Sequence, residues 1–437
     1  MTMTGHGTVQ LPSLLDTDLY KLTMQQAVLQ HFPDAQVTYR FTNRSKEMQF
    51  TAATVDAVRA GIEHLGTLRI SAEEEAWLRE ACPYFQEKYL AFLRDFQLRP
   101  ADEVDVRFVP TDGEYGQLEV LIQGAWASVI LYEVPVMAII SETYFQTVDR
   151  DWTAAGQRER AADKARKLLQ HGVMLSEFGT RRRRSLATHV EVMHGLLDAQ
   201  KEVGDAPGAG RILGTSNIYL AKQFGVAPVG TVAHEWTMAI AAIHGYEHSN
   251  LRALQLWDAV YQPPAFTPAR PVDDLTIALT DTFSTRVFWD DLLSSESGKE
   301  ILRRWRGVRQ DSGDSRVFVR HALDVYRSIG VDPAKKLVIF SDGLNVERCL
   351  ELQAFAKEMG ILAGFGVGTH LTNDFGCASD TSRKSRALNM VLKLDSINGH
   401  PTVKISDELT KNTGDADEIA LVKRRFGLSG ADSVEDA

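Results

Sequence analysis

The sequence predicts an α/β fold built on a parallel sheet or barrel, because strand-like and helix-like segments alternate along its second half. The clearest unit is a strand over 336–340, a helix over 345–359 and a strand over 361–365, which together have the length of a βαβ crossover. Another helix is expected over 314–329, where apolar residues share one face and Gly330 provides the stop.

The first part of the chain, residues 1–150, mixes helix and strand. A helix is expected over 17–29, where apolar residues recur near helical spacing and Pro33 lies just beyond. Alternating, β-rich residues predict strands over 37–42 and 118–122.

Two segments predict irregular connections, because glycine and proline interrupt regular hydrogen bonding. They are 204–210 (GDAPGAG) and 261–271 (YQPPAFTPARP). The acidic tail over 429–437 is expected to be frayed.

Length and composition exclude several classes of protein. The chain has 437 residues, 44% of them hydrophobic and 24% charged, which suits two or three domains or one large α/β barrel with additions. A net charge of −10 disfavours nucleic-acid binding, since contact with phosphates needs a basic surface. The longest apolar runs, such as 134–140, are shorter than the roughly 18 residues of a membrane helix, so no membrane association is expected.

Cysteine usage and the N-terminal residues predict a cytoplasmic protein. Cys82, Cys349 and Cys377 are widely spaced and odd in number, which fits neither a disulfide framework nor a zinc motif. The first residues lack a basic stretch followed by an apolar one, so no secretory signal is expected.

Small and acidic residues follow several expected strands. The strand 275–279 leads into Thr280-Asp281-Thr282, 336–340 into Ser341-Asp342-Gly343, and 361–365 into Gly366-Val367-Gly368-Thr369, while 307–316 reads GVRQDSGDSR. Ligands of parallel barrels bind at the carboxyl ends of the strands, so we expect these residues to meet in one site. Exposed backbone N–H groups bind phosphate and carboxylates bind Mg²⁺ or ribose hydroxyls, which suits a phosphorylated substrate and a divalent cation.

Each of these motifs also has a purely structural interpretation. DSGD commonly caps a helix, and GFGVGT commonly forms a tight turn between a strand and a helix. GFGVGT departs from GxGxxG, and Gly298-Lys299 is followed by Glu300, so neither a dinucleotide-binding fold nor a P-loop is supported.

His234 lies in GTVAHEWTM, after an expected strand over 226–232 and beside Glu235. Histidine can act as a general base, a metal ligand or a phosphoryl acceptor, and a carboxylate near one ring nitrogen would fix its tautomer. The structural alternative is a buried, hydrogen-bonded histidine. Met238 stands four residues further on, so the HExxH zinc motif is excluded.

The chain also carries four consecutive arginines, Arg181, Arg182, Arg183 and Arg184. Such runs are usually solvated, and consecutive side chains cannot all point one way, so at most one or two are expected to face a site. Arginine there would suit bidentate contact with phosphate or carboxylate.

Seven motifs, taken in order, resemble those of the nicotinate phosphoribosyltransferase family, in its bacterial and fungal branch. They are LLDTDLYKLTMQQAV (14–28), EFGTRRR (177–183), GTSN (214–217), GTVAHEW (230–236), RQDSGD (309–314), FSDGL (340–344) and FGVGTHLTND (365–374).

The resemblance implies an irregular α/β barrel of the type II phosphoribosyltransferase kind with an N-terminal mixed α+β domain. Residues 1–150 would form that domain together with C-terminal segments, 151–415 the barrel with the active site, and 416–437 a C-terminal helix and the frayed tail. It also implies a carbon–nitrogen ligase of NAD salvage, which joins nicotinate to 5-phosphoribosyl 1-diphosphate and yields nicotinate mononucleotide and diphosphate. ATP hydrolysis would be coupled to this reaction through a phosphohistidine, with Mg²⁺ as cofactor, and related enzymes are dimers with shared active sites.

The roles of the family's residues carry over by position. His234 matches the phosphorylated histidine, and Tyr20 and Phe178 match the aromatic residues on either face of the pyridine ring, with Tyr20 contributed by a second subunit if the site is shared. Thr231 and Arg309 match positions near nicotinate, whose carboxylate would pair with Arg309.

The remaining positions concern the phosphates, the ribose and the metal. Arg181 matches an arginine of the base and phosphate pocket, Asp311 and Asp342 match acidic residues near the ribose and Mg²⁺, and Gly343, Gly366, Gly368 and Thr369 match turns that bind the 5-phosphate. Arg182, Arg183 and Arg184 are expected at the surface or behind the pocket.

Ser216 bears on substrate choice. The related nicotinamide enzyme has an aspartate there, which accepts from the amide and would repel nicotinate, so serine fits the acid. Nicotinamide phosphoribosyltransferase and a non-catalytic sensor of NAD metabolites on the same fold remain as alternatives. Quinolinate phosphoribosyltransferase fits less well, because it needs a more basic pocket and has no phosphohistidine.

Overall fold

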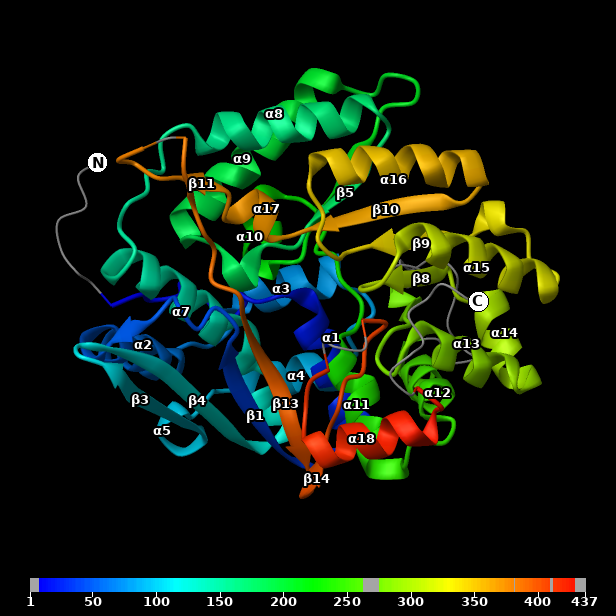
Figure 1. Cartoon of the computed structure of the whole chain (residues 1–437), viewed down its shortest axis with the longest axis horizontal. Coiled ribbons are helices and arrows are strands. Elements are labelled where there is room, and N and C mark those ends of the chain that lie inside the picture. Colours follow the sequence, from blue (N-terminus) through cyan, green and yellow to red (C-terminus); the bar gives the residue numbers. More distant parts are fainter. Residues whose placement is uncertain (1–7, 262–274, 381, 409–411, 429–437) are drawn as a thin grey trace.

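The computed structural model describes residues 8–261, 275–380, 382–408 and 412–428. It contains two large sheets, one antiparallel and one parallel, with the helix α1 (Leu19–His31) between them (Figure 1). Of the predicted connection over 261–271, Tyr261 is the last residue of a helix, and the remainder lies outside the described residues, as does the tail over 429–437.

The parallel sheet forms the irregular α/β barrel that the resemblance implies. Its strands lie in the order β6–β5–β10–β9–β8–β7. They are β5 (Met174–Glu177), β6 (Arg211–Thr215), β7 (Ile277–Leu279), β8 (Gly307–Gln310), β9 (Leu337–Phe340) and β10 (Leu362–Val367). In the part of the chain that the structure describes, no ladder joins β6 to β7, so the barrel is open between these two strands.

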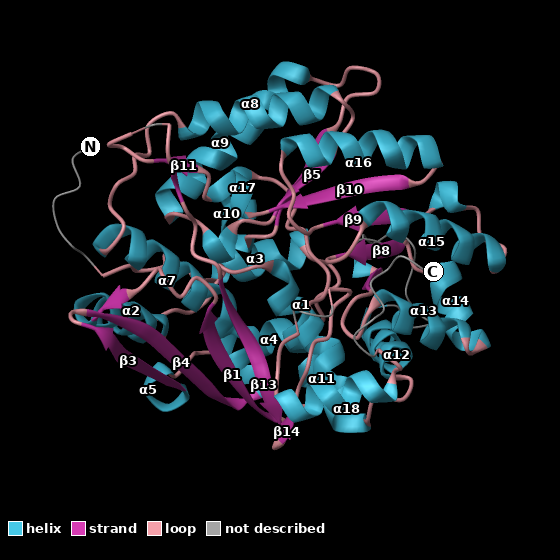
Figure 2. Ribbon diagram, viewed as in Figure 1, coloured by secondary structure: helices cyan, strands magenta, loops and turns pink. Residues whose placement is uncertain are grey.

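The βαβ unit predicted from the sequence is confirmed. Strands β9 and β10 pair in parallel, and the helix α16 (Val346–Met359) packs against β10 (Figure 2). The Asn345 side chain accepts from the backbone N–H of Arg348 at 2.8 Å and so caps the first turn of α16. Gly360 ends the helix in the left-handed conformation, with φ of +73°.

The antiparallel sheet has the order β14–β13–β1–β4–β2, and β3 pairs with β4. Its strands are β1 (Gln36–Asn43), β2 (Phe50–Thr51), β3 (Val104–Asp112), β4 (Tyr115–Ala125), β13 (Met390–Ile397) and β14 (His400–Pro401). The predicted strands at 37–42 and 118–122 correspond to β1 and β4. In Figure 1 the orange β13 lies beside the blue β1, where Val37 pairs with Ile397, so the C-terminal part of the chain completes a sheet begun at the N-terminus.

The helices fill the space around both sheets. The remaining ones are α2 (Ala52–Leu65), α3 (Ala72–Ala81), α4 (Glu87–Asp95), α5 (Pro100–Glu103), α6 (Trp126–Val129), α7 (Glu133–Thr147), α8 (Gln157–Gln170), α9 (Leu186–Val203), α10 (Ile218–Phe224), α11 (His234–His244), α12 (Ser249–Tyr261), α13 (Thr285–Leu293), α14 (Glu296–Arg304), α15 (Ser315–Ser328), α17 (Thr369–Thr372) and α18 (Ala416–Arg425). The segment Trp126–Thr147 is long and apolar enough to span a membrane. However, 83% of its most apolar stretch of 18 residues is buried within the fold, as in a core helix of a globular protein.

The expected strand over 226–232 is wrong. A single parallel bridge joins Pro228 to Thr215, and the backbone reaches α11 without forming a ladder. Pro228 has no N–H to donate, and Gly230 adopts a φ of +147°, so the segment cannot continue as a regular strand. The predicted connection at 204–210 is confirmed between α9 and β6.

Candidate functional site

Every residue to which the resemblance assigns a ligand or the phosphorylation site lines one of two adjoining hollows of the barrel. The larger is a cavity of about 680 Å³, and its walls include His234, Asp311, Asp342, Gly343, Gly366, Gly368 and Thr369. The smaller is a pocket of about 250 Å³, whose walls include Tyr20, Ser216 and Thr231. Phe178, Arg181 and Arg309 line both, so the two hollows form one continuous site.

His234 is the first residue of α11 and lies at the junction of the helix with the barrel. Its Nδ1 is 3.1 Å from Thr282 Oγ1, and its Nε2 is 2.9 Å from Lys404 Nζ and 3.2 Å from Asp311 Oδ2. Burial lowers the pKa of His234 and Lys404 lowers it further, against the opposite effect of Asp281 and Asp311. The ring is therefore neutral at physiological pH, which leaves one nitrogen lone pair available as a nucleophile.

The carboxylates near this ring come from the barrel and not from the neighbouring Glu235. Asp281 Oδ1 lies 3.7 Å from His234 Nε2, whereas the Glu235 side chain turns away to the N-terminal domain. Successive residues in the first turn of a helix point in different directions, which explains the separation.

Asp311 is a charged group with a defined set of partners. Its Oδ1 accepts from Arg309 Nη2 at 2.9 Å and from Ser341 Oγ at 2.6 Å. Burial by itself would raise the pKa of Asp311, but Arg309, His234 and Lys404 together bring it well below its usual range. Asp311 thus remains ionised in the cavity and can stabilise positive charge on a ligand.

The smaller pocket is bounded by aromatic rings. Phe178 directly follows β5, and its backbone N–H donates to Val367 on β10 at 2.8 Å. A Cβ atom on Gly366 would lie 2.3 Å from the Phe178 ring, so glycine is required for the ring to lie against β10. Tyr20 of the same chain also lines this pocket.

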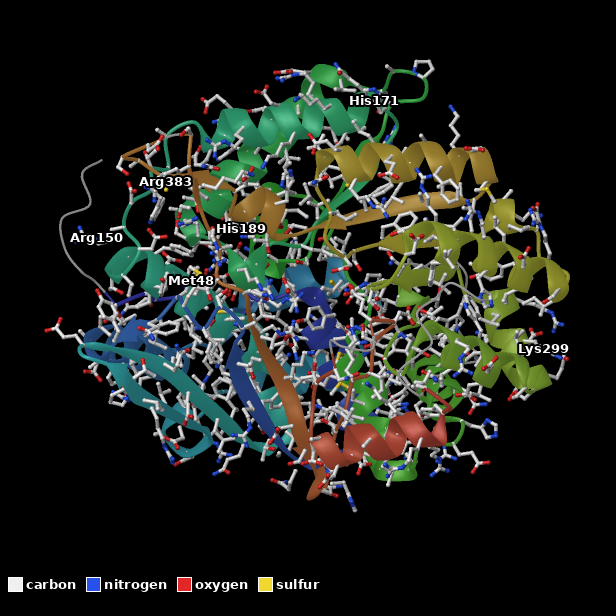
Figure 3. All side chains as sticks on the ribbon, viewed as in Figure 1. Met48, Arg150, His171, His189, Lys299 and Arg383 are labelled. Carbon is white, nitrogen blue, oxygen red and sulfur yellow. The ribbon has the colours of Figure 1, made fainter. Side chains whose placement is uncertain are left out.

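The residue before Phe178 has buried polar contacts. Glu177 precedes Phe178, and its Oε2 lies 2.9 Å from His189 Nε2 and accepts from Thr215 Oγ1 at 2.6 Å. Figure 3 shows His189 within the fold, in contrast to the exposed His171 and Arg383 at its edge.

The pocket also holds a carboxylate that sequence analysis missed. Asp18 lines it, and Ser216 Oγ donates to Asp18 Oδ1 at 2.8 Å. Burial raises the pKa of Asp18, and Arg181 and Ser216 oppose this effect. Asp18 belongs to the LLDTDLYK motif, but nothing in that motif indicates which of its two aspartates faces a ligand.

The arginine run divides between the site and the interior, since Arg181 is exposed, Arg182 half-buried, and Arg183 and Arg184 buried. Arg183 and Arg184 thus take the second of their two expected places, behind the pocket, and not the surface. Arg183 is fully buried and forms a bidentate pair with Asp16 at 2.7 Å, and the Arg184 guanidinium lies 3.6 Å from the centre of the Phe145 ring. Arg182 lines the larger cavity with Arg181 and donates to the carbonyl of Met390 at 2.8 Å. Two of the four arginines face the site, which is the upper limit expected for such a run, but Arg182 was expected at the surface or behind the pocket. The run lies in a tight turn that directs consecutive side chains to different sides.

Two cationic side chains of the site come from a part of the chain without any motif. Lys404 Nζ lies 3.0 Å from Asp281 Oδ2, close to His234, and Lys393 on β13 lines the cavity. Burial lowers the pKa of Lys393 to about 7, and Lys404 and Arg44 contribute to the same effect. Their place in the site follows from the pairing of β13 with β1, which the sequence does not reveal.

Comparisons with known proteins agree with this architecture. The model of the nicotinate phosphoribosyltransferase (NAPRTase) N-terminal domain matches residues 15–141, and that of the NAPRTase family matches 173–430. The chain is 39% identical to a Saccharomyces cerevisiae nicotinate phosphoribosyltransferase, over 96% of each chain, and 38% identical to one from Methanosarcina mazei, over 97% of this chain and all of the relative.

A solved structure supports the same relationship. The nicotinate phosphoribosyltransferase of Porphyromonas gingivalis superimposes with a TM-score of 0.84 at 33% identity, over 95% of this chain and 100% of that one. The motifs, the paired hollows at the strand ends and these matches together show that the chain belongs to the nicotinate phosphoribosyltransferase family.

Proposed function

We propose that this protein joins nicotinate to 5-phosphoribosyl 1-diphosphate, giving nicotinate mononucleotide and diphosphate, as a step of NAD salvage in the cytoplasm. The observation that carries the proposal is the junction of a small aromatic pocket with a larger polar cavity, at which Phe178, Arg181 and Arg309 line both. The pyridine ring would enter the pocket and the phosphoribosyl group the cavity. This brings the ring nitrogen to the anomeric carbon at their junction.

The expected bond change needs little covalent chemistry from the protein. The lone pair of the nicotinate nitrogen forms the bond to the anomeric carbon, and the bond from that carbon to the diphosphate oxygen breaks with its electron pair. Positive charge develops on the ribose, and the ionised Asp311 is suited to stabilise it. Arg309 would pair with the nicotinate carboxylate, and the backbone of Gly343, Gly366, Gly368 and Thr369 would bind the 5-phosphate.

ATP would be coupled to this reaction through His234. With its proton on Nδ1, near Thr282, the ring carries its lone pair on Nε2, where it accepts from Lys404 until a phosphoryl group takes that place. That nitrogen forms a bond to the γ-phosphorus of ATP, the bond to the ADP oxygen breaks, and water later releases inorganic phosphate. Lys404, at 2.9 Å from Nε2, would neutralise charge on the transferred phosphoryl group.

Mg²⁺ would bind at the outer part of the cavity, with Asp342 as the main protein ligand and Asp311 beside it. His234, Asp281 and Asp311 each offer a ligand atom within 4.8 Å of one another. However, the Lys404 ammonium group contacts His234 and Asp281, so a second cation in that cluster would be repelled. Asp342 is exposed on the cavity wall and has a hard oxygen donor that Mg²⁺ prefers. When bound, the ion neutralises the leaving diphosphate.

A turnover assay tests the proposal. Purified protein with nicotinate, 5-phosphoribosyl 1-diphosphate and Mg²⁺ is expected to form nicotinate mononucleotide, and ATP is expected to increase the yield and release ADP. Faster turnover of nicotinamide would favour the amide-specific enzyme, and binding of both substrates without product would favour a sensor. The homodimer remains a prediction, for which light scattering during gel filtration gives the measurement.

A further inference from the structure

We propose that Lys21 is a positioning residue that couples the phosphorylation state of His234 to the binding of nicotinate. The inference rests on the proposed function, because it concerns the two ligands of that same site. It is carried by a buried chain of charged groups that connects the aromatic pocket to the first turn of α11.

The centre of this chain of charged groups is a lysine without solvent contact. Lys21 lies on α1 and its side chain is 0% exposed, with Nζ 2.6 Å from Glu133 Oε2 and 2.5 Å from Glu235 Oε2. The two carboxylates belong to different elements, since Glu133 begins α7 and Glu235 lies in the first turn of α11. A buried cation between two carboxylates is costly to disturb, because loss of any partner leaves an uncompensated charge.

One end of this chain of charged groups contacts residues of the aromatic pocket. The Tyr20 hydroxyl donates to the same Oε2 of Glu133 at 3.1 Å, and Arg181 Nη1 lies 3.5 Å from Glu133 Oε1. Tyr20 and Arg181 both line the pocket proposed for nicotinate. A displacement of Glu133 would therefore move two groups that contact the ligand.

The other end of this chain of charged groups is Glu235, which is bonded to His234 through the backbone. Glu235 follows His234 directly, and its Oε1 accepts from Tyr39 at 2.5 Å and from Trp126 Nε1 at 2.7 Å. The helix α1 also contacts the segment before α11, because Thr23 Oγ1 donates to the carbonyl of Thr231 at 3.0 Å. The first turn of α11 is thus held to α1 on both sides of His234.

A phosphoryl group on His234 changes the forces on this turn. It adds about −1.5 to −2 charges at neutral pH, next to Asp281 and Asp311, which repel it, and Lys404, which attracts it. A shift of the turn is transmitted from Glu235 through Lys21 to Glu133, and from there to Tyr20 and Arg181. By thermodynamic reciprocity, an effect of phosphorylation on nicotinate affinity implies an equal effect of nicotinate on the phosphorylation equilibrium.

The test compares the KM for nicotinate with and without ATP in three proteins. In the unaltered protein ATP is expected to lower this KM by about fivefold or more, the usual lower range of coupling between two sites. In Lys21→Met the ratio of the two KM values is expected to approach one, while kcat falls less than kcat/KM. Lys336→Met is the matched control, because Lys336 is also buried but donates to backbone carbonyls at the end of α14, and it lines neither of the two hollows. The Lys336→Met variant should be less stable than the unaltered protein but have the same ratio of the two KM values.

Glu133→Gln gives a second, nearly isosteric variant in case Lys21→Met does not fold. It removes one carboxylate and leaves the pair between Lys21 and Glu235, and its KM ratio is also expected to approach one. An unchanged ratio in whichever of these variants folds would overturn the inference, as would the absence of any ATP effect on KM in an active unaltered protein. Failure of the unaltered protein to form nicotinate mononucleotide at all would instead overturn the proposed function.

Discussion

Ser216 donates a hydrogen bond to Asp18 within the aromatic pocket, at 2.8 Å, and both side chains are buried. A carboxylate is thus already present beside the expected nicotinate position, and Ser216 provides it with a neutral donor. The preference for the acid therefore cannot result from the absence of a carboxyl group in this pocket. We expect it to depend on Ser216 and Arg181, which oppose the rise that burial causes in the pKa of Asp18.

Ser216→Asp is expected to lower kcat/KM for nicotinate by about a hundredfold or more. The variant would put two buried carboxylates in contact, and an uncompensated buried charge costs about 3–5 kcal/mol. Steady-state kinetics with nicotinate measures the effect. Ser216→Ala, which only removes the donor, is the control and should cost about 1–3 kcal/mol at most. An unchanged kcat/KM in Ser216→Asp would contradict this account of selectivity.

His234→Asn is expected to lose the stimulation by ATP, because the amide has no lone pair of comparable nucleophilicity. Parallel measurement of ADP and nicotinate mononucleotide distinguishes coupling from simple loss of turnover. The unaltered protein should carry an acid-labile phosphoryl group after incubation with ATP, and the variant should not. Full ATP stimulation in His234→Asn would show that another group accepts the phosphoryl.

Gly366→Ala is expected to raise the KM for nicotinate by about tenfold, corresponding to about 1.4 kcal/mol. The new Cβ would lie 2.3 Å from the Phe178 ring, which must move away from β10. Gly364→Ala on the same strand is the control, since its Cβ would meet the far end of the Ile339 side chain, which can rotate. Equal effects of the two substitutions on KM would contradict the specific role of Gly366.

The affinity of the cavity for inorganic diphosphate is expected to contain a pH-dependent contribution from Lys393. Its pKa is lowered to about 7, so the ammonium form is present below this pH and is lost as the pH rises through it. Above pH 7 the affinity of the unaltered protein for diphosphate should therefore fall more steeply than that of Lys393→Met. The variant lacks the ammonium group, so it shows only the effect of the protonation of diphosphate itself. Calorimetric titrations of both proteins between about pH 6 and 8.5 measure the difference. If the affinities of the two proteins changed with pH in the same way, Lys393 would be excluded as an anion ligand.

Arg183→Met is expected to destabilise the protein by about 3–5 kcal/mol, because Asp16 would remain buried without its cationic partner and keep only the hydrogen bond from Asn217. Arg211→Met is a matched substitution in an exposed pair with Asp205, where the cost should be at most about 1 kcal/mol. Urea unfolding of both variants gives the comparison. Similar urea midpoints for the two variants would mean that the buried pair of Arg183 and Asp16 contributes little to the free energy of unfolding.

Local signals were sufficient for much of this fold. The helix α16 has an N-cap at Asn345 and a stop at Gly360, and both can be read from neighbouring residues. The strand-end motifs met in one site because parallel strands bring their carboxyl ends to one edge. The error at 226–232 has a local cause as well, since Pro228 should have weighed against a strand.

Other features depend on contacts between distant parts of the chain. Lys404 reaches His234 only because the chain after β13 returns to the barrel, and no motif surrounds it. Arg183 is buried because Asp16, far away in the sequence, accepts both of its N–H groups. Such positions are set by tertiary pairing, which composition and spacing do not encode.

The pairing of β1 with β13 has a consequence for biosynthesis. Val37 is synthesised long before its partner Ile397. Until then β1 has an unpaired edge, which is prone to association with other chains. Closing so large a loop is slow and entropically costly. The nascent chain should therefore be most susceptible to aggregation and most responsive to chaperones during synthesis of the residues between β1 and β13.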